Sequence, residues 1–264
     1  HMAGLMQGKR GLIMGVANER SIAWGIAKAM ADQGAELAFT YQGEAFGKRV
    51  EPLAASVGST ILVDADVMDP ASLDAAFSRL AAEWGKLDFL VHAIAYTDKA
   101  ELAADFRFRD TTRANFAQTM DISCFSFIDT ARRAAAMMPD GGTILTLTFE
   151  GSNRVMPCYN VMGVVKAALE ASVRYLAADL GPQGIRVNAV SPGPMKTLAG
   201  SAIGSARATY RQTEAAAPLR SNATLEAVGG TAVYLASGAG AFTTGEIIRV
   251  DGGVHVMGIA QSEG

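Results

Sequence analysis

Residues 10–25 read RGLIMGVANERSIAWG, and this stretch decides the fold. Its first part is a short apolar run typical of a buried strand, and its last part begins a helix. Gly15, Ser21 and Gly25 lie in or near the turn between them. Such a turn lets the backbone approach a pyrophosphate, and the helix N-terminus offers unpaired N–H groups. The strict G-x-G-x-x-G pattern is absent, so an ordinary strand-to-helix turn remains an alternative.

The rest of the chain repeats this alternation of strand and helix. We predict strands at residues 10–16, 35–41, 59–67, 87–95, 141–149, 185–193 and 245–253. We predict helices at residues 22–33, 44–57, 70–84, 112–138, 158–181 and 225–237, with a further segment at 198–215. This order indicates an α/β fold of the Rossmann type, with a doubly wound sheet of seven parallel strands and helices on both faces. The ligand is then expected beyond the carboxyl ends of the strands.

The composition limits the function classes. Of the 264 residues, 50% are hydrophobic and 19% are charged, which indicates one large globular domain rather than a disordered chain. The net charge of −3 gives no footprint for nucleic acid, and no apolar run reaches the roughly 18 residues of a membrane span. We therefore expect neither a nucleic-acid nor a membrane partner.

The domain boundaries follow from the motifs. We assign residues 1–7 to a tag remnant and tail, residues 8–258 to the domain, and residues 259–264 to a C-terminal tail. Two cysteines are too few for a disulfide framework, so a cytoplasmic location is expected. The three histidines lack metal-ligand spacing, so no metal site is expected.

Two further strand ends suit a dinucleotide. Gln42 follows the second predicted strand, where many such folds hold an acid for the adenosine ribose. No basic residue follows immediately for a 2′-phosphate, which favours NADH, although Lys48 and Arg49 keep NADPH open. Asp66 and Val67 end the third strand and suit an adenine edge, although an Asp there is often only a helix cap.

Residues 159–166 read YNVMGVVK, with a phenol and an ammonium seven positions apart. Seven residues advance a helix by roughly 700°, so Tyr159 and Lys166 are predicted to leave one helical face and share one site. From the spacing alone, a surface pair on an amphipathic helix is the better explanation.

These motifs together resemble a known family. The set consists of G-x5-S-I-A-x-G from Gly15, Gln42, Asp66-Val67, H-A-I-A (92–95), Y-x2-M-x3-K from Tyr159 and P-G-P-M-K-T (192–197). It resembles the divergent short-chain dehydrogenase/reductases, and within them the bacterial NADH-dependent enoyl-acyl-carrier-protein reductases. In ordinary members of the wider family the lysine comes four residues after the tyrosine, where this chain has Gly163.

The resemblance implies roles for these residues. Tyr159 would bind the thioester carbonyl oxygen of a trans-2-enoyl substrate, and Lys166 would hold the nicotinamide ribose. It further implies a substrate lid at 198–215, substrate contacts at Thr97, Phe149 and Met162, and a homotetramer. Cofactor positions would be Gly15, Ser21, Ile22, Gln42, Asp66, Val67, Ile94, Lys166, Met195, Lys196, Thr197, Leu198 and Ala199. The implied activity is reduction of the enoyl double bond by NADH in fatty-acid or related lipid synthesis.

The sequence departs from the family pattern at the predicted substrate pocket. Most bacterial members carry a second tyrosine where this chain has Phe149, although the mycobacterial branch also has Phe there. Glu150 follows where a small, apolar or aromatic residue is usual, so we expect its carboxylate to face water or the pocket to accept a more polar substrate. Arg207 and Arg211 are the basic residues found in the lid, so either acyl carrier protein or coenzyme A can be the carrier.

Two other functions stay open from the sequence. Thr146 lies thirteen residues before Tyr159, where carbonyl-reducing relatives place a catalytic serine, so a carbonyl reductase or alcohol dehydrogenase is one alternative. The other is a catalytically silent cofactor-binding paralogue.

Overall fold

The computed structural model describes residues 4–260, and within that range seven parallel strands form a single sheet. The strands are β1 (Arg10–Met14), β2 (Glu36–Tyr41), β3 (Ile61–Asp64), β4 (Phe89–His92), β5 (Gly142–Leu147), β6 (Ile185–Pro192) and β7 (Ile247–Val250). Their order is β3-β2-β1-β4-β5-β6-β7, so the direction of winding reverses between β1 and β4. The predicted doubly wound Rossmann-type sheet is confirmed, and its switch point lies beside the turn after β1.

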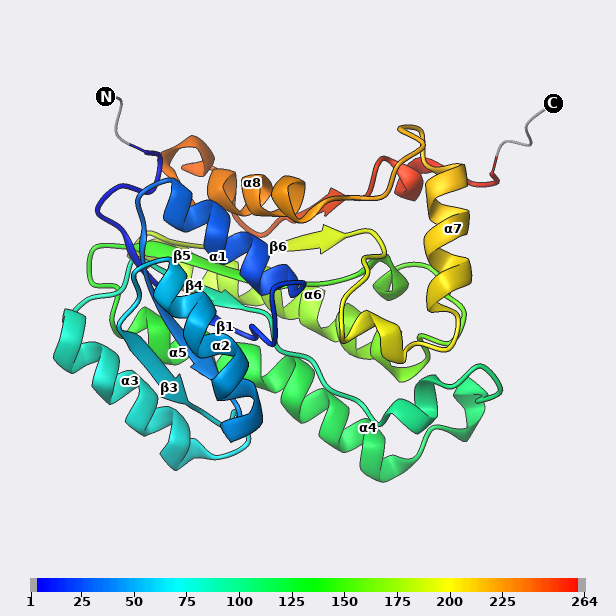
Figure 1. Ribbon diagram of the computed structural model, residues 1–264, viewed down its shortest axis with the longest axis horizontal. Helices are drawn as coiled ribbons and strands as arrows, with labels where there is room; N and C mark the ends of the chain where they lie inside the picture. The colour runs from blue at the N-terminus through cyan, green and yellow to red at the C-terminus, as the bar shows by residue number, and fades with distance from the viewer. Residues whose placement is uncertain (1–3, 261–264) are drawn as a thin grey trace.

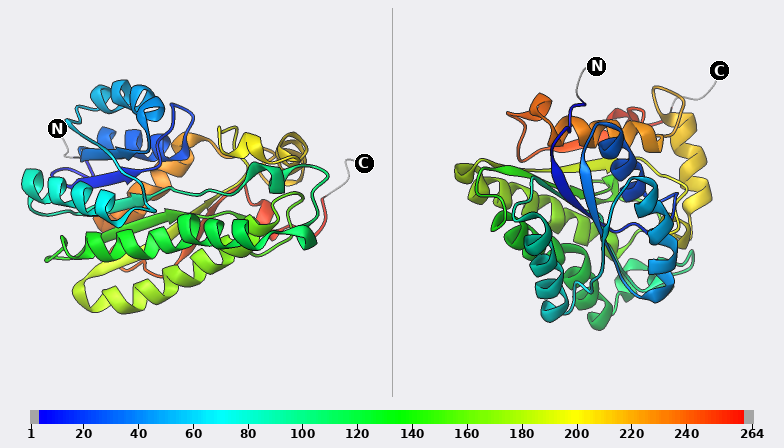
Figure 2. Two further views of the ribbon diagram at one scale, coloured as in Figure 1. Left: turned by 90° about the horizontal axis from the view of Figure 1, so that it is seen from below. Right: turned by 60° about the vertical axis from the view of Figure 1, so that its left-hand side comes forward.

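Helices cover both faces of the sheet (Figures 1 and 2). One face carries α1 (Ile22–Asp32), α2 (Glu44–Ser56) and α8 (Leu225–Ala236), whose apolar residues pack into one core layer. The other face carries α3 (Pro70–Trp84), α5 (Ser126–Ala135) and α6 (Val161–Leu180), which form the second layer. Local signals set the helix starts. At α3, for example, the Asp69 side chain caps Ala71 N–H and Pro70 occupies the first turn.

The predicted helix at 112–138 is divided into three parts. It consists of α4 (Arg113–Met120), the π-helical turn η3 (Asp121–Phe125) and α5. Ser126 Oγ donates to Ile122 O at 2.6 Å, and Ser123 Oγ lies 2.8 Å from the backbone N of Tyr96 and 2.9 Å from its O. No glycine or proline marks the change from α-helix to π-helix. The apolar periodicity of the sequence therefore predicts one continuous helix.

The predicted segment at 198–215 contains η6 (Gly200–Ala202) and α7 (Ala206–Ala216). Figure 1 shows α7 beyond the carboxyl end of β6. Short turns complete the chain: η1 (Lys99–Leu102), η2 (Phe108–Asp110), η4 (Glu150–Ser152), η5 (Gly181–Gln183), η7 (Gly238–Gly240) and η8 (Val254–Val256).

Residues 1–3 and 261–264 of the predicted tails lie outside the described range. Within the first predicted tail, Met6 is fully buried and its N–H donates to Gln33 O. Among residues 4–260, no helix combines the length and the apolar composition that a bilayer crossing requires.

Candidate active site

Tyr159 lies in a turn, and only Lys166 belongs to a helix. α6 begins at Val161, and the residues that flank the tyrosine, Cys158 and Asn160, have φ of +67° and +49°. Left-handed residues cannot continue a right-handed helix, so the prediction that α6 starts at 158 and carries both side chains on one face is wrong. The turn, and not two helical turns, sets the direction of the phenol.

The Tyr159 ring is fixed by apolar contacts. It is 7% exposed and packs with Leu102 and Met162. The edge of one ring meets the face of the other between Tyr159 and Phe149, with centroids 5.0 Å apart and planes at 75°. Phe149 therefore supplies packing where most family members supply a hydroxyl.

Burial controls the protonation of the two central groups. It raises the pKa of the Tyr159 phenol, and the negative charge of Glu170 raises it further. It lowers the pKa of Lys166 to about 8, against the opposing charges of Glu170 and Cys124. Lys166 Nζ donates to Leu147 O at 2.9 Å. Tyr159 is thus held as a neutral donor.

The Thr146 side chain is engaged in a buried hydrogen-bond network and not directed at a ligand. Its side chain is 1% exposed; Oγ1 donates to His92 O at 3.1 Å and lies 3.0 Å from His92 Nδ1. His92 Nε2 lies 2.8 Å from Ser126 Oγ, and burial lowers the pKa of the imidazole to about 3. His92 is therefore a neutral link between β4, β5 and α5.

The turn after β1 requires a glycine at its start and leads into an uncapped helix. Gly15 has φ of +108°, and a Cβ there would lie 1.9 Å from Ala93 O. Ser21 Oγ accepts from Ala17 N–H and Asn18 N–H, at 2.9 and 3.1 Å. It makes no cap hydrogen bond to α1, so the first N–H groups of that helix have no side-chain cap. These features fit the diphosphate of a dinucleotide.

The residues predicted for the adenosine side lie after the ends of β2 and β3. Gln42 is exposed directly after β2, and the next N–H, that of Gly43, donates to Asp64 Oδ1 at 3.0 Å. Asp66 Oδ1 accepts from Met68 N–H at 2.9 Å. Because the helix cap is Asp69, Asp66 is not the cap of α3.

The two basic residues that kept NADPH open both have partners on α2. Lys48 Nζ lies 3.7 Å from Glu44 Oε1, and the Arg49 guanidinium lies 5.9 Å from the centre of the Phe46 ring.

The predicted cofactor stretch after β6 is an ordered turn. Thr197 Oγ1 accepts from Gly200 N–H at 2.9 Å, and Lys196 Nζ lies 4.7 Å from the centre of the Tyr210 ring on α7. Met195 packs against the core, whereas Leu198 is 44% exposed. Ile94 and Val67 are half-buried against the opposite core layer. Ile22 and Ala199, the remaining predicted positions, lie at the first turn of α1 and directly before η6.

Thr97 lies in a polar cluster behind the predicted substrate position. Asn115 Nδ2 and Thr119 Oγ1 both donate to Thr97 Oγ1, each at 2.9 Å.

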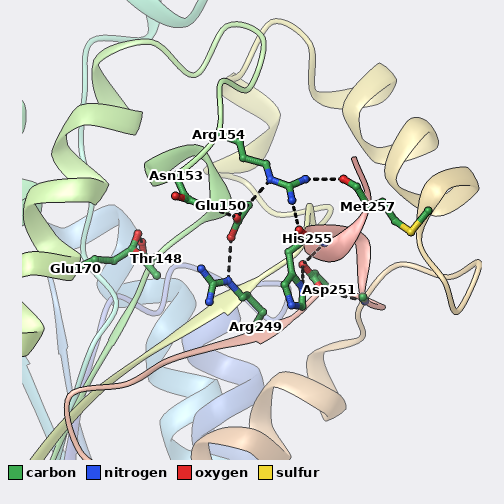
Figure 3. A network of polar contacts seen from close by, with 10 residues as sticks. Thr148, Glu150, Asn153, Arg154, Glu170, Arg249, Asp251, His255 and Met257 are labelled. Atoms are coloured by element: carbon green, nitrogen blue, oxygen red, sulfur yellow. Dashed lines mark hydrogen bonds and ion pairs between the residues drawn. The ribbon is translucent and has the colours of Figure 1, made fainter. Parts of the chain in front are cut away.

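Glu150 is buried and paired, so the expectation that its carboxylate faces water was wrong. It is 7% exposed, and Arg249 Nε lies 3.1 Å from its Oε2 (Figure 3). Asn153 Nδ2 donates to Oε1 at 3.1 Å, and Arg154 Nε lies 3.9 Å away. Arg154 also donates to the backbone oxygens of His255 and Met257, while His255 Nδ1 lies 2.9 Å from Asp251 Oδ1. The network joins the turn before Tyr159 to the C-terminal segment.

An enclosed cavity of about 50 Å³ lies between this network and the end of β6. Its wall includes Phe149, Pro192–Pro194, Thr213 of α7 and the Asp251–His255 pair. Phe149, the backbone at the end of β6 and Thr213 of the predicted lid thus border one space.

The comparisons with known proteins agree with this geometry. The family model described as enoyl-(acyl carrier protein) reductase matches residues 15–255. The chain belongs to this family.

Individual relatives are similar over nearly their whole length. The enoyl-[acyl-carrier-protein] reductase [NADH] 2 of Rhizobium meliloti (strain 1021) is 60% identical over 262 residues, which are 99% of this chain and 97% of the relative. The NADH enzyme of Rickettsia felis is 51% identical, with 97% of each chain covered. The crystal structure of the Anaplasma phagocytophilum reductase in complex with NAD is 53% identical and has a TM-score of 0.95, with 99% of each chain covered.

The structure shows three residues near the candidate site that the sequence analysis did not predict. Asp64 at the adenosine side, Glu170 near Lys166 and Arg249 beside Glu150 were not predicted. Asp64 is the last residue of β3 but lies inside the strand predicted at 59–67, so its position at the strand end was not predicted. Arg249 could not be predicted, because its partner lies 99 residues away.

Proposed function

We propose that this protein reduces the 2,3-double bond of a trans-2-enoyl thioester with NADH, in fatty-acid or related lipid synthesis. The observation that carries the proposal is Tyr159, a buried phenol that burial keeps neutral, two residues before the helix that carries the buried Lys166. Such a group can donate one hydrogen bond to an oxygen on which charge develops. The identities of 60% and 51% to reductases named for this reaction support it.

In the proposed reaction, each residue of the candidate site has its own role. When bound, NADH supplies a hydride to the β-carbon of the substrate, which leaves negative charge on the thioester oxygen. Tyr159 donates a hydrogen bond to that oxygen, and this donor contributes on the order of 3 kcal/mol to lowering the barrier. Lys166 donates to the nicotinamide ribose hydroxyls, while Met162 and Phe149 hold the phenol in place. Gly15 and the first turn of α1 hold the diphosphate, and Asp66 and Val67 the adenine.

The preference for NADH has support at the end of β2. A 2′-phosphate there would meet the Asp64 carboxylate, which already holds Gly43 N–H. The cations of α2 are engaged with Glu44 and Phe46.

Acyl carrier protein is the proposed carrier of the substrate. Gly204 N–H donates to Leu102 O at 2.8 Å, so the lid meets the segment that carries exposed Arg107, Arg109 and Arg113. These side chains add to Arg207 and Arg211 of α7, which gives an acidic carrier more positive charge than the lid sequence alone indicates.

A homotetramer in the cytoplasm completes the proposal. Large apolar side chains are exposed on η3, α5 and α6, with Phe125 at 55%, Ile128 at 37% and Val164 at 40%. A second copy packed on this face would cover them.

Steady-state oxidation of NADH tests the function. We expect turnover with crotonyl-CoA or a longer enoyl thioester and little with a 3-oxoacyl thioester. The first alternative, a carbonyl reductase, lacks a free second donor, because Thr146 is engaged with His92. Turnover of only the 3-oxoacyl substrate would nevertheless establish it, and NADH binding without any turnover would establish a silent paralogue.

A further inference from the structure

We propose that Glu170 is a positioning residue of the active site, which fixes the end of β5 and supplies the negative charge that Lys166 faces. The inference rests on the proposed function only in its consequence for turnover. The contacts and the effect on cofactor binding are independent of which substrate is reduced.

Glu170 and Lys166 lie one turn apart on α6 and contact two consecutive residues, the last residue of β5 and the one after it. Lys166 Nζ donates to Leu147 O at 2.9 Å, and Thr148 Oγ1 donates to Glu170 Oε2 at 2.8 Å. All three side chains that make these contacts are less than a tenth exposed. Phe149 follows directly, with its ring against Tyr159. The two α6 side chains therefore hold the end of β5 in place. Leu147 O, which accepts from Lys166, and Phe149, which packs on Tyr159, both depend on the position of this segment.

The same carboxylate acts electrostatically on both central groups. Burial lowers the pKa of Lys166 to about 8, and Glu170 is the strongest group that opposes this change. Glu170 also adds to the raised pKa of Tyr159. Without this charge, Lys166 would lose its proton closer to neutral pH and would then have fewer donors for ribose hydroxyls.

Two other titratable groups near this pair do not replace the negative charge of Glu170. Cys124 on η3 also opposes the loss of the Lys166 proton, and His92 on β4 is neutral because its pKa is about 3. On its outer side Glu170 lines a polar cleft of about 440 Å³ together with Arg174, Glu246 and Arg249.

The affinity for NADH as a function of pH tests the proposal without turnover. In the unaltered protein, we expect binding measured by calorimetry between pH 6 and 9.5 to weaken above about pH 8, as Lys166 loses its proton. Glu170→Gln keeps an oxygen for Thr148 but removes the charge, and should move the midpoint of this weakening down by about one pH unit. Asp179→Asn is the matched control, because it removes an exposed carboxylate from the same helix, and should leave the midpoint unchanged.

Thr148→Val separates positioning from charge. It removes the hydrogen bond and leaves the carboxylate, so kcat with crotonyl-CoA should fall several-fold while the midpoint for NADH stays in place.

If Glu170→Gln does not fold by circular dichroism, Glu170→Asp replaces it and should shift the midpoint in the same direction by a smaller amount. An unmoved midpoint in the folded variant overturns the charge role, and unchanged kcat in Thr148→Val overturns the positioning role. Failure of the proposed function shows separately, as absence of enoyl reduction by the unaltered protein.

Discussion

The two halves of the site are held together in different ways. On the cofactor side, Ser21 bonds Ala17 N–H four residues away, and Asp64 bonds Gly43 N–H across 21 residues. On the substrate side, Asn160 Nδ2 reaches Glu101 O across 59 residues, and Glu150 reaches Arg249 across 99. The first half follows from strand ends and turns, whereas the second depends on side chains that the fold brings together.

The largest expected effect is at the centre of the substrate half. Tyr159→Phe keeps the ring that packs on Phe149 and Met162 but removes the hydroxyl. We expect kcat for a saturating enoyl thioester to fall about 10²- to 10³-fold, because one donor to the developing charge is lost. Steady-state kinetics measures this change.

The affinity for NADH serves as the control for Tyr159→Phe. It should stay within a few-fold of the unaltered protein, because Gly15, Ser21 and Asp66 are untouched. Undiminished turnover would remove Tyr159 from the proposed chemistry.

The sequence predicts the cofactor half better for a physical reason. The apolar runs of β1 to β3 and the Asp69-Pro70 helix start are local signals, so the strand ends that carry Gln42 and Asp66 could be placed without a structure. The turn at Tyr159 could not, because its left-handed residues are Cys158 and Asn160 rather than glycines. The π-helical turn η3 was hidden in the same way, since no breaker interrupts the apolar period.

A smaller effect is expected where the substrate half depends on a distant ion pair. Arg249→Met leaves the Glu150 carboxylate, 7% exposed, with only Asn153 and the more distant Arg154. We expect the free energy of unfolding to fall by about 1–3 kcal/mol. The KM for the enoyl thioester should also rise several-fold while the KM for NADH changes little. Denaturant unfolding and kinetics measure the two effects.

The double variant Glu150→Leu with Arg249→Met is the matched control. It removes both partners and places an apolar residue where the family usually has one, so most of the lost stability should return. If the double variant is as unstable as Arg249→Met alone, the unpaired carboxylate is not the cause.

The smallest expected effect sharpens the cofactor half. Asp64→Asn keeps an oxygen that can accept from Gly43 N–H but removes the charge beside the expected 2′-position of the ribose. Because Asp64 is exposed, the repulsion that is lost amounts to about 1 kcal/mol, or roughly fivefold in affinity. NADPH should therefore bind about fivefold more tightly to the variant, while NADH binding changes by less than a factor of two.

Competition between the two cofactors at low and high salt measures the difference. The gain for NADPH should shrink as salt rises, since an exposed charge is screened. A gain that is equal for both cofactors would place Asp64 away from the 2′-position, and the preference for NADH would then depend on the absence of a free basic residue after β2.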